Sequence, residues 1–300
     1  MRYKVLVIFL PRFIIYLTNG MIVIKKTEEL KNQLLELKSV SKSVGFVPTM
    51  GALHQGHISL IEQSVKENQL TVVSIFVNPT QFNNPEDLIN YPRTEEEDLN
   101  LLKKAGTDIV FLPTIETIYP NGEISEEFDF NDLENQMEGK FRPGHFNGVG
   151  TVVKRFFEII QPDRAYFGEK DFQQLQIISQ MVKSLQLPVK IIPAAIKREK
   201  DGLAMSSRNR RLSEEMRKEA PKIYEVLLQS KSYLENHSPD ETVEFVKAQF
   251  KNSSLELEYF EIADEITLKS VKSIQKGQKV RGFIAAFADD IRLIDNLRLN

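Results

Sequence analysis

The sequence predicts an α/β protein in which a parallel sheet is followed by a second, smaller α+β domain. Two observations support this prediction. Between residues 21 and 196, short apolar segments alternate with amphipathic segments of helical period, which is typical of strand–helix–strand units and a parallel sheet. Beyond Arg208, two charged helical segments precede long strand-like segments, which indicates a separate unit. We place the boundary between residues 196 and 197, so the expected domains are 21–196 and 197–300.

Each expected element has a local signal. Leucines at 30, 34, 35 and 37 predict a helix over 28–38. The run Leu70–Val77 is almost continuously apolar, as expected for a strand that is covered on both faces. The helix over 94–106 begins with acids and ends with lysines and Gly106, which suits the helix dipole and a C-terminal cap. In the first domain we expect strands at 21–26, 44–49, 70–77, 108–113, 164–169 and 189–196, and helices at 28–38, 57–67, 94–106, 148–162 and 171–186. In the second we expect helices at 213–234 and 240–250, and strand segments at 255–264 and 279–296.

A Rossmann-like arrangement of this kind predicts where the chemistry lies. In open parallel sheets, ligands bind beyond the carboxyl ends of the strands. Polar and glycine-rich segments follow the strands that end near Thr49, Val77 and Gly168. We therefore expect these three segments to form one site.

Composition excludes several classes of function. The net charge is −3, from 39 Lys and Arg against 42 Asp and Glu, so no general basic field exists for nucleic acid and no nucleic-acid partner is expected. The chain has no cysteine, which excludes disulfides, thiolate nucleophiles and cysteine-ligated zinc. A reducing compartment fits this composition, and we expect a cytoplasmic protein.

The first 20 residues differ from the rest. Two short apolar runs are broken by Pro11 and Arg12, and each is far shorter than the roughly 20 residues of a membrane helix. No clear signal-peptide pattern is present. We interpret residues 1–20 as an extension that is disordered or precedes a native start at Met21, and we expect no membrane association. A weak signal or a surface anchor is the alternative.

The segment FVPTMGALHQGH, residues 46–57, holds two of the four histidines of the chain. Gly51 and Gly56 lack the Cβ atoms that would keep the backbone away from a phosphate. A helix that begins near His57 points its N–H groups and its positive dipole end at the same place. His54 and His57 are three residues apart and can project to one side, where imidazoles can bind phosphate oxygens and, if charged, offset developing charge. Zinc is disfavoured because no third soft ligand is evident.

Two further strands are followed by polar residues. Gln81 comes after the strand over 70–77, and its amide can pair with a hydroxyl and a carboxylate. Lys170 supplies a point charge suited to phosphate, and Asp171 can cap the helix that follows. Gln174, one turn along that helix, can face the same pocket.

The predicted domain junction also carries polar groups. Ser206, Ser207 and Arg208 provide two hydroxyls and a guanidinium in succession, which suits a polyphosphate. A loop at such a junction can close over its ligand.

Six segments occur in a characteristic order: FVPTMGALHQGH, SIFVNPTQF, YPRT, RPGHFNGV, FGEKDFQQL and DGLAMSSRN. An H-x-G-H segment after a parallel strand is similar to the HIGH signature of the nucleotidyltransferase superfamily. Together the six segments resemble the pantoate–β-alanine ligase family, and the resemblance extends from about Met21 to the DIRLIDN segment at 290–296.

The resemblance implies an ATP-dependent condensation of (R)-pantoate with β-alanine through a pantoyl adenylate, with Mg²⁺, in a homodimer. It implies the catalytic residues His54, His57, Lys170, Ser206, Ser207 and Arg208. It implies ATP contacts from Met50, Gly51, Ala52, Leu53, His54, Gln55, Gly56, His57, Gly168, Glu169, Lys170, Asp171, Lys197, Met205, Ser206, Ser207 and Arg208. It implies substrate contacts from Gln81, Gln174, Tyr91 and Glu138, and no metal site made by the protein alone.

Some residues have plainer interpretations. Lys197 departs from the family pattern, which has an apolar residue near the adenine, although backbone atoms there can make the same contact. Glu97 and Asp98 lie in an acidic helix, which we interpret as a solvent-exposed face rather than a Mg²⁺ site. For His145 no chemistry follows from its position, and a structural turn role is an equal expectation.

Two other functions stay open. A different H-x-G-H nucleotidyltransferase could act on another small-molecule acceptor, but it has no need of Gln81, Gln174 and their flanking segments. A non-enzymatic RNA-binding relative of an aminoacyl-tRNA synthetase is the second, and the net charge of −3 argues against it.

Overall fold

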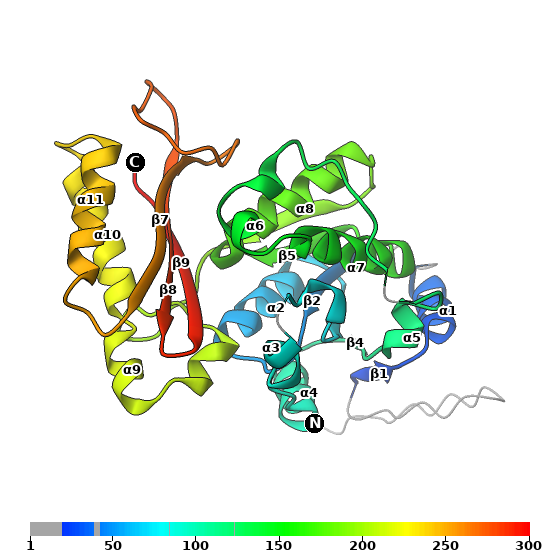
Figure 1. Ribbon diagram of the computed structural model, residues 1–300. Coiled ribbons are helices and arrows are strands. Elements are labelled where there is room, and N and C mark those ends of the chain that lie inside the picture. Colours follow the sequence, from blue (N-terminus) through cyan, green and yellow to red (C-terminus); the bar gives the residue numbers. More distant parts are fainter. Residues whose placement is uncertain (1–19, 39–42, 84, 123) are drawn as a thin grey trace.

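The computed structural model describes residues 20–38, 43–83, 85–122 and 124–300. Six parallel strands form one sheet in the order β1-β4-β3-β2-β5-β6, and three antiparallel strands form a second in the order β7-β8-β9 (Figure 1). The predicted parallel α/β sheet and smaller α+β part are therefore confirmed. The domain boundary between residues 196 and 197 stays a prediction. Residues 1–19 lie outside the described residues, so the interpretation of the segment 1–20 also stays a prediction.

The strands agree closely with those expected. They are β1 (Ile22–Ile24), β2 (Val44–Thr49), β3 (Leu70–Ile75), β4 (Ile109–Phe111), β5 (Arg164–Gly168), β6 (Lys190–Ala194), β7 (Glu256–Asp264), β8 (Val280–Ala288) and β9 (Ile291–Arg298). The α-helices are α1 (Thr27–Lys38), α2 (Gln55–Glu67), α3 (Pro85–Ile89), α4 (Glu95–Ala105), α5 (Ile115–Ile118), α6 (Met137–Phe141), α7 (His145–Ile160), α8 (Phe172–Ser184), α9 (Glu214–Glu219), α10 (Lys222–Leu234) and α11 (Pro239–Phe250). Short 3₁₀ helices are η1 (Pro79–Gln81), η2 (Leu133–Asn135), η3 (Glu169–Asp171) and η4 (Ser207–Arg211).

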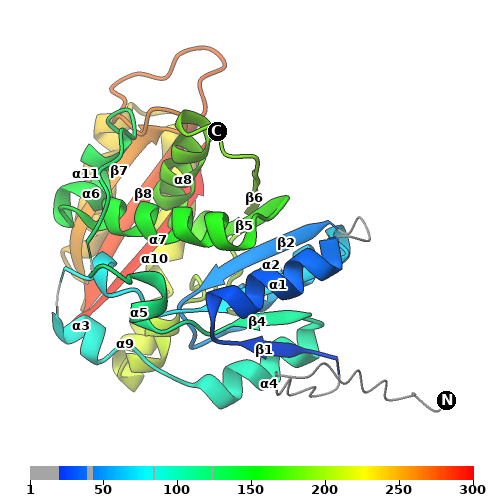
Figure 2. The same cartoon turned by 90° about the vertical axis from the view of Figure 1, so that its right-hand side faces the viewer.

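Helices cover both faces of the parallel sheet. Val44 and Phe46 of β2 pack into a core shared with α1, α7 and α8, whereas Val47 packs on the other side with α2 and α4. Successive side chains of a strand point to opposite faces, so a doubly covered strand is apolar at nearly every position. Figure 2 shows α7 and α8 on one side of these strands. This layering explains the near-continuous apolar runs.

The strand order places the ligand site. From β2 the chain moves outward through β3 and β4 on one side, and β5 and β6 lie on the other. The order therefore reverses between β2 and β5, and the crevice at such a reversal is where open parallel sheets bind ligands. The segments after β2 and β5 are the histidine motif and the Lys170 turn.

The second sheet packs between the first unit and its own helices. Figure 1 shows α10 and α11 on the outer side of β7–β9. On the inner side, Phe283 meets Phe172 of α8 at 5.8 Å between ring centroids, and Tyr259 stacks on Phe141 of α6 at 5.3 Å. The C-terminal sheet is thus anchored on helices that flank the crevice.

One predicted helix, over 213–234, is wrong. The structure divides it into α9 and α10, with Pro221 at the start of the second. Proline lacks the N–H that a continuous helix would use at this position, and its ring crowds the preceding turn. The strand segment expected over 279–296 is likewise a hairpin, β8 and β9, which turns at Asp289 and Asp290.

None of the helices in the described ranges has the length and apolar character of a membrane span.

Candidate active site

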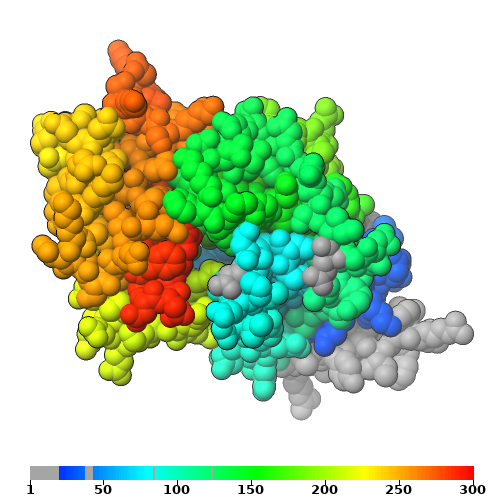
Figure 3. Space-filling model, viewed as in Figure 1, coloured from blue at the N-terminus to red at the C-terminus, as the bar shows by residue number. Residues whose placement is uncertain are grey.

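One cleft lies at the carboxyl ends of β2, β3 and β5 and beside the loop that follows β6. Figure 3 shows a hollow between the C-terminal strands, in red, and the cyan segment after β3. The residues lining the cleft include Thr49, Met50, His54, Gly56, His57, Asn78, Gln81, Tyr91, Gly168, Lys170, Asp171, Gln174, Lys197, Met205, Ser206, Ser207 and Arg208. The expectation that the segments after three strands form one site is confirmed.

Six predicted residues do not line this cleft: Gly51, Ala52, Leu53, Gln55, Glu169 and Glu138. Leu53 is buried in the core shared with α2, and Gln55 is exposed. Glu169 faces the C-terminal sheet, where its carboxylate lies 3.7 Å from Arg281.

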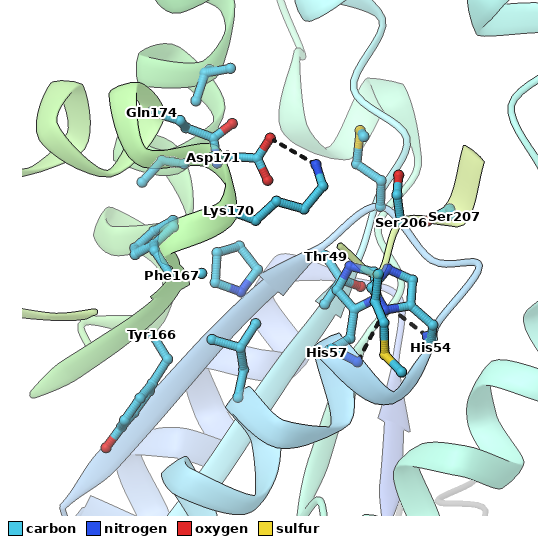
Figure 4. Close-up of a pocket in the computed structure, with 18 of the residues that line it drawn as sticks. Thr49, His54, His57, Tyr166, Phe167, Lys170, Asp171, Gln174, Ser206 and Ser207 are labelled. Atoms are coloured by element: carbon cyan, nitrogen blue, oxygen red, sulfur yellow. Dashed lines mark hydrogen bonds and ion pairs between the residues drawn. The ribbon is translucent and has the colours of Figure 1, made fainter. Parts of the chain in front are cut away.

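His54 and His57 form the cap of α2. The helix begins at Gln55, two residues earlier than predicted, because His54 is the N-cap and accepts a 3.1 Å hydrogen bond from Gly56 N at Nδ1. The N–H of His54 in turn donates to Nδ1 of His57 at 3.4 Å. The ring centroids lie 4.0 Å apart, side by side across the cleft from Lys170 (Figure 4). The prediction that both rings project to one side is confirmed.

This cap determines what the rings can do. Since Nδ1 accepts a hydrogen bond in both, a neutral ring carries its proton on Nε2. Burial, then the charge of the neighbouring His57 and of Lys170, lowers the pKa of His54 to about 3. Burial, then Lys170, lowers the pKa of His57 to about 4. At neutral pH both are neutral N–H donors, so the imidazolium form considered from sequence is not the form that the site favours.

His145 is also buried, at the start of α7. Its Nδ1 lies 2.8 Å from the carbonyl oxygen of Gln81. Burial, then the charge of Arg142, lowers the pKa of His145 to about 3. It therefore supports the loop that carries Gln81, in agreement with the structural role expected for it.

We expect His145 to make the fold acid-sensitive. In the unfolded chain the ring gains a proton near pH 6.5, and in the folded chain it does not. The contribution of His145 to the free energy of unfolding is therefore fully present above about pH 6.5 and decreases as the pH drops. By pH 5 the loss from this group is about 2 kcal/mol. His145→Asn should remove that part of the decrease, measured as the difference in unfolding free energy between pH 7 and pH 5 in urea. The exposed His237→Asn is the control, and an equal pH dependence in both variants would contradict the assignment.

Asp98 corrects the interpretation of the acidic helix. Its side chain is buried, with 1 % of the residue surface exposed, and it accepts hydrogen bonds from Ala52 N at 2.9 Å and Leu53 N at 2.7 Å. Gly51 and Ala52 both have positive φ, so their turn points successive N–H groups at one spot. A carboxylate of the protein fills that spot. The turn at Gly51 therefore seats Asp98, and its expected approach to a phosphate stays a prediction.

Gly56 is needed for a different reason. A Cβ at this position would lie 2.8 Å from the His54 ring and 3.5 Å from the Cβ of Met205. The absence of a side chain therefore lets the His54 cap form, whereas the distance to Met205 would be an ordinary van der Waals contact. Glu97, the neighbour of Asp98, is exposed as predicted.

The Lys170 turn, η3, follows β5. The Lys170 Nζ lies 3.7 Å from Asp171 Oδ1, and Figure 4 shows both side chains projecting into the cleft with Gln174 above them. Asp171 precedes α8, but its side chain makes no capping hydrogen bond to the helix. The predicted cap is therefore wrong, and the carboxylate is available to the cleft.

The loop after β6 supplies the fourth side of the cleft. Lys197 O accepts from Met205 N at 3.0 Å, so the loop closes on itself as a narrow hairpin. The Ser206 hydroxyl accepts from Arg208 N at 3.3 Å, and Ser207 and Tyr91 both line the cleft. The loop thus holds the side chains of Ser206, Ser207 and Arg208 at the cleft.

Arg208 is not free in this structure. Its Nη2 lies 2.8 Å from Oδ2 of Asp87 in α3, and Arg211 binds the other oxygen of the same carboxylate at 3.1 Å. Burial opposes ionisation of Asp87, but the two arginines outweigh it and lower its pKa. Asp87 was not singled out in the sequence, because its position in an irregular polar segment carries no signal.

Glu138 lies beside the cleft rather than in its lining. Its oxygens accept from Arg292 of β9 at 2.7 and 2.8 Å and from the Tyr259 hydroxyl at 2.7 Å. Burial alone would raise the pKa of Glu138, but Arg292 outweighs burial and the pKa is lowered. This carboxylate is paired with the C-terminal sheet, and it lines a smaller neighbouring cavity together with Lys170, Asp171 and Gln174, so its contact with a substrate stays a prediction.

Several lining residues were not predicted. One is Asn78, which donates to the Gly148 carbonyl and to Gln81 Oε1. An apolar group adds Phe76, Val149, Val152, Val153 and Phe156. The α7 residues could have been suspected, because the helix was predicted and is apolar on most sides, but only the fold shows which side faces the cleft. Among the described residues, no group of three or more His, Asp or Glu side chains is placed to hold a metal.

The chain is similar in sequence to a known family of enzymes. Residues 22–298 match the family model described as pantoate-beta-alanine ligase. A pantothenate synthetase of Christiangramia forsetii is 54 % identical over 93 % of this chain and 99 % of its own length. One from Flavobacterium psychrophilum is 51 % identical over 93 % and 100 %.

Solved structures give the same result. A pantothenate synthetase from Thermus thermophilus superposes with a TM-score of 0.84, at 41 % identity over 92 % of this chain and 99 % of that one. A pantoate-beta-alanine ligase from Francisella tularensis, complexed with beta-gamma ATP and β-alanine, has a TM-score of 0.78 at 37 % identity, covering 93 % and 98 %. With the family model matching nearly the whole chain, these likenesses show that the chain belongs to the pantoate–β-alanine ligase family and is a ligase that joins pantoate to β-alanine.

Proposed function

We propose that the ligation is driven by ATP through a pantoyl adenylate, with release of AMP and pyrophosphate. The observation that supports this most strongly is that three phosphate-suited segments, the histidine motif, the Lys170 turn and the Met205–Arg208 loop, line one cleft at the strand-order reversal between β2 and β5. A free carboxylate acylates poorly because its leaving group is poor, and AMP is a good leaving group. No protein nucleophile is required for this route.

The first step is attack of a pantoate carboxylate oxygen on the α-phosphorus of ATP. The new O–P bond forms as the bond to pyrophosphate breaks. His54 and His57 donate their Nε2 hydrogens to phosphate oxygens, and Lys170 supplies the positive charge, with Ser206, Ser207 and Arg208 at the far phosphates. These donors stabilise charge as it develops. In the second step the β-alanine amine attacks the acyl carbon, loses a proton, and AMP leaves.

Pantoate is an acid with two hydroxyls and a geminal dimethyl group. The apolar side chains of α7 suit the methyl groups, and Gln81 and Gln174 suit the hydroxyls and the carboxylate. Tyr91, buried against Phe82, completes the wall near these groups.

Mg²⁺ is part of the proposal as the counter-ion of ATP. A Mg²⁺ held mainly by phosphates and water needs one or two protein carboxylates, and Asp171 lines the cleft beside Lys170. When bound, the ion would neutralise phosphate charge.

The proposed function is tested by AMP release from Mg·ATP, pantoate and β-alanine, with each omitted in turn. AMP formation should require pantoate, and pantothenate should form only when β-alanine is also present. A folded chain that binds ATP but releases no AMP with pantoate would contradict the adenylate route. It would favour another H-x-G-H transferase.

Gln174→Ala should weaken pantoate binding selectively. A hydrogen bond to a charged group contributes about 1.5–3 kcal/mol, so the KM for pantoate should rise roughly 10- to 100-fold, while the KM for ATP changes less than about threefold. Initial rates of AMP formation measure both. Gln180→Ala, on the same helix but outside the lining, is the control, and a matching rise in the KM for ATP would contradict the assignment.

We also propose a cytoplasmic homodimer, which rests on the composition and the family resemblance. Light scattering should give twice the chain mass of 34.5 kDa. A mass of one chain would contradict the dimer.

A further inference from the structure

Strand β9 carries two buried polar residues with no part in the proposed chemistry. Asp295 and Asn296 are 4 % and 2 % exposed. They belong to the segment DIRLIDN, which marks the end of the family resemblance. Their partners include residues of two segments that are far apart in sequence, the Lys170 turn and the base of the loop after β6.

Asn296 holds the Lys170 turn. Its Nδ2 donates to the carbonyl oxygens of Glu169 and Lys170, both at 2.9 Å. Its Oδ1 accepts from Arg281 Nη1 at 2.6 Å, and that guanidinium also lies over the Phe172 ring at 4.1 Å. Both amide hydrogens and the amide oxygen are therefore used, which prevents the side chain from rotating away. The backbone that aims Lys170 is thus fixed by the C-terminal sheet.

Asp295 holds the base of the loop after β6. Its two oxygens accept from Arg198 at 2.6 and 3.0 Å, in a bidentate pair. Arg198 also lies over the Tyr224 ring at 3.7 Å and pairs through its backbone with Ala204. Ala204 is directly followed by the Met205–Arg208 segment. The position of that segment is therefore set from the same strand.

We propose that Asp295 and Asn296 are positioning residues that set the distance between the two ATP-binding segments, Gly168–Asp171 and Met205–Arg208. The inference rests on the proposed ATP-dependent function. Asn296 contacts the first segment directly, and Asp295 contacts Arg198, whose backbone pairs with Ala204, the residue before the second segment, so the strand acts as a spacer between the two segments. Phosphoryl chemistry depends on such spacing, because a misplacement of about 1 Å can cost 10²-fold in rate.

The test uses the full chain with Asn296→Asp and Asp295→Asn. The first replaces the NH2 group, with its two donor hydrogens, by a carboxylate oxygen that repels the two carbonyls, and the second removes the charge that holds Arg198. We expect kcat/KM for ATP to fall about 10- to 100-fold, with the KM for pantoate within about twofold. Asn252→Asp, in an exposed turn, and Asp289→Asn, in the β8–β9 turn, are the matched controls and should leave both constants unchanged.

A double-mutant cycle separates positioning from general stability. If Asn296 acts through Lys170, then Asn296→Asp should cost little in a Lys170→Ala background, because the group that it positions is already gone. Additive losses would overturn the inference. Equal decreases in kcat/KM for ATP and for pantoate would also overturn the inference. Unchanged kinetic constants in folded variants would overturn it too.

Folding is checked by circular dichroism, and Asn296→Ala replaces Asn296→Asp if the charged variant does not fold. Failure of all three variants to fold would overturn the inference, because the two residues would then serve stability alone. No AMP formation by the unmodified chain would overturn the proposed function and this inference with it. An active chain with unaffected variants would overturn this inference only.

Discussion

Lys170→Ala is expected to lower kcat for AMP formation about 10²- to 10³-fold, the range found when one preorganised donor is removed from a site of developing charge. The Lys170 ammonium lies in the cleft at 3.7 Å from the carboxylate of Asp171, its neighbour in the chain. With Lys170 in place the nearby histidines are neutral, because burial first and then neighbouring charges that include Lys170 lower their pKa values to about 3 and about 4, so the positive charge at this position comes from the lysine.

The measurement is single-turnover AMP formation with saturating pantoate. Lys183→Ala, exposed on the adjoining helix α8, is the matched control and should keep the unmodified rate. A loss below about threefold for Lys170→Ala would show that the charge is not used in the transition state. A rise in the KM for ATP with kcat unchanged would show instead that Lys170 binds ATP equally well in the ground state and in the transition state.

Asp98→Asn is expected to have the largest effect on stability, lowering the unfolding free energy by about 2–4 kcal/mol. The variant keeps the shape but replaces one acceptor oxygen by an amide donor, which then opposes a buried backbone N–H. The two hydrogen bonds at stake, to Ala52 and Leu53, hold the turn that leads into the His54 cap. AMP formation should therefore fall as well, even though Asp98 does not line the cleft.

Urea unfolding measures the stability change, and Glu97→Gln is the control. Glu97 is the preceding residue and carries the same charge, but its side chain is 71 % exposed. It should change the unfolding free energy by less than about 0.5 kcal/mol. Equal effects of the two variants would show that the carboxylate of Asp98 is not the anchor of the turn.

The geometry of the histidine motif illustrates how far sequence reasoning extends. The spacing of His54 and His57 was enough to place both rings on one side of a helix start. It was not enough to give their charge, which depends on burial and on Lys170 and Arg210, residues more than a hundred positions away. Their tautomers also depend on the cap, which begins α2 two residues earlier than predicted.

The acidic residues show the opposite outcome. Glu97 and Asp98 are adjacent in one acidic helix, and the sequence predicts a solvent-exposed position for both. It holds for Glu97 and is wrong for Asp98, because only the packing of α4 against α2 brings one carboxylate to the turn at Ala52. The surroundings of Glu138 also depend on the tertiary structure, because its partners Arg292 and Tyr259 come from the C-terminal sheet.

The sequence by itself determined the parallel sheet, the identity of the polar segments and the expectation that they meet at the strand ends. Such features depend on periodicity and on turn chemistry within a few residues, which each segment carries in full. The strand order, the neutral state of the histidines and the ties from Asp295 and Asn296 were decided only by the tertiary structure. They arise from contacts between residues tens to hundreds of positions apart, and the energy of such a contact depends on burial and on partners that no local pattern specifies.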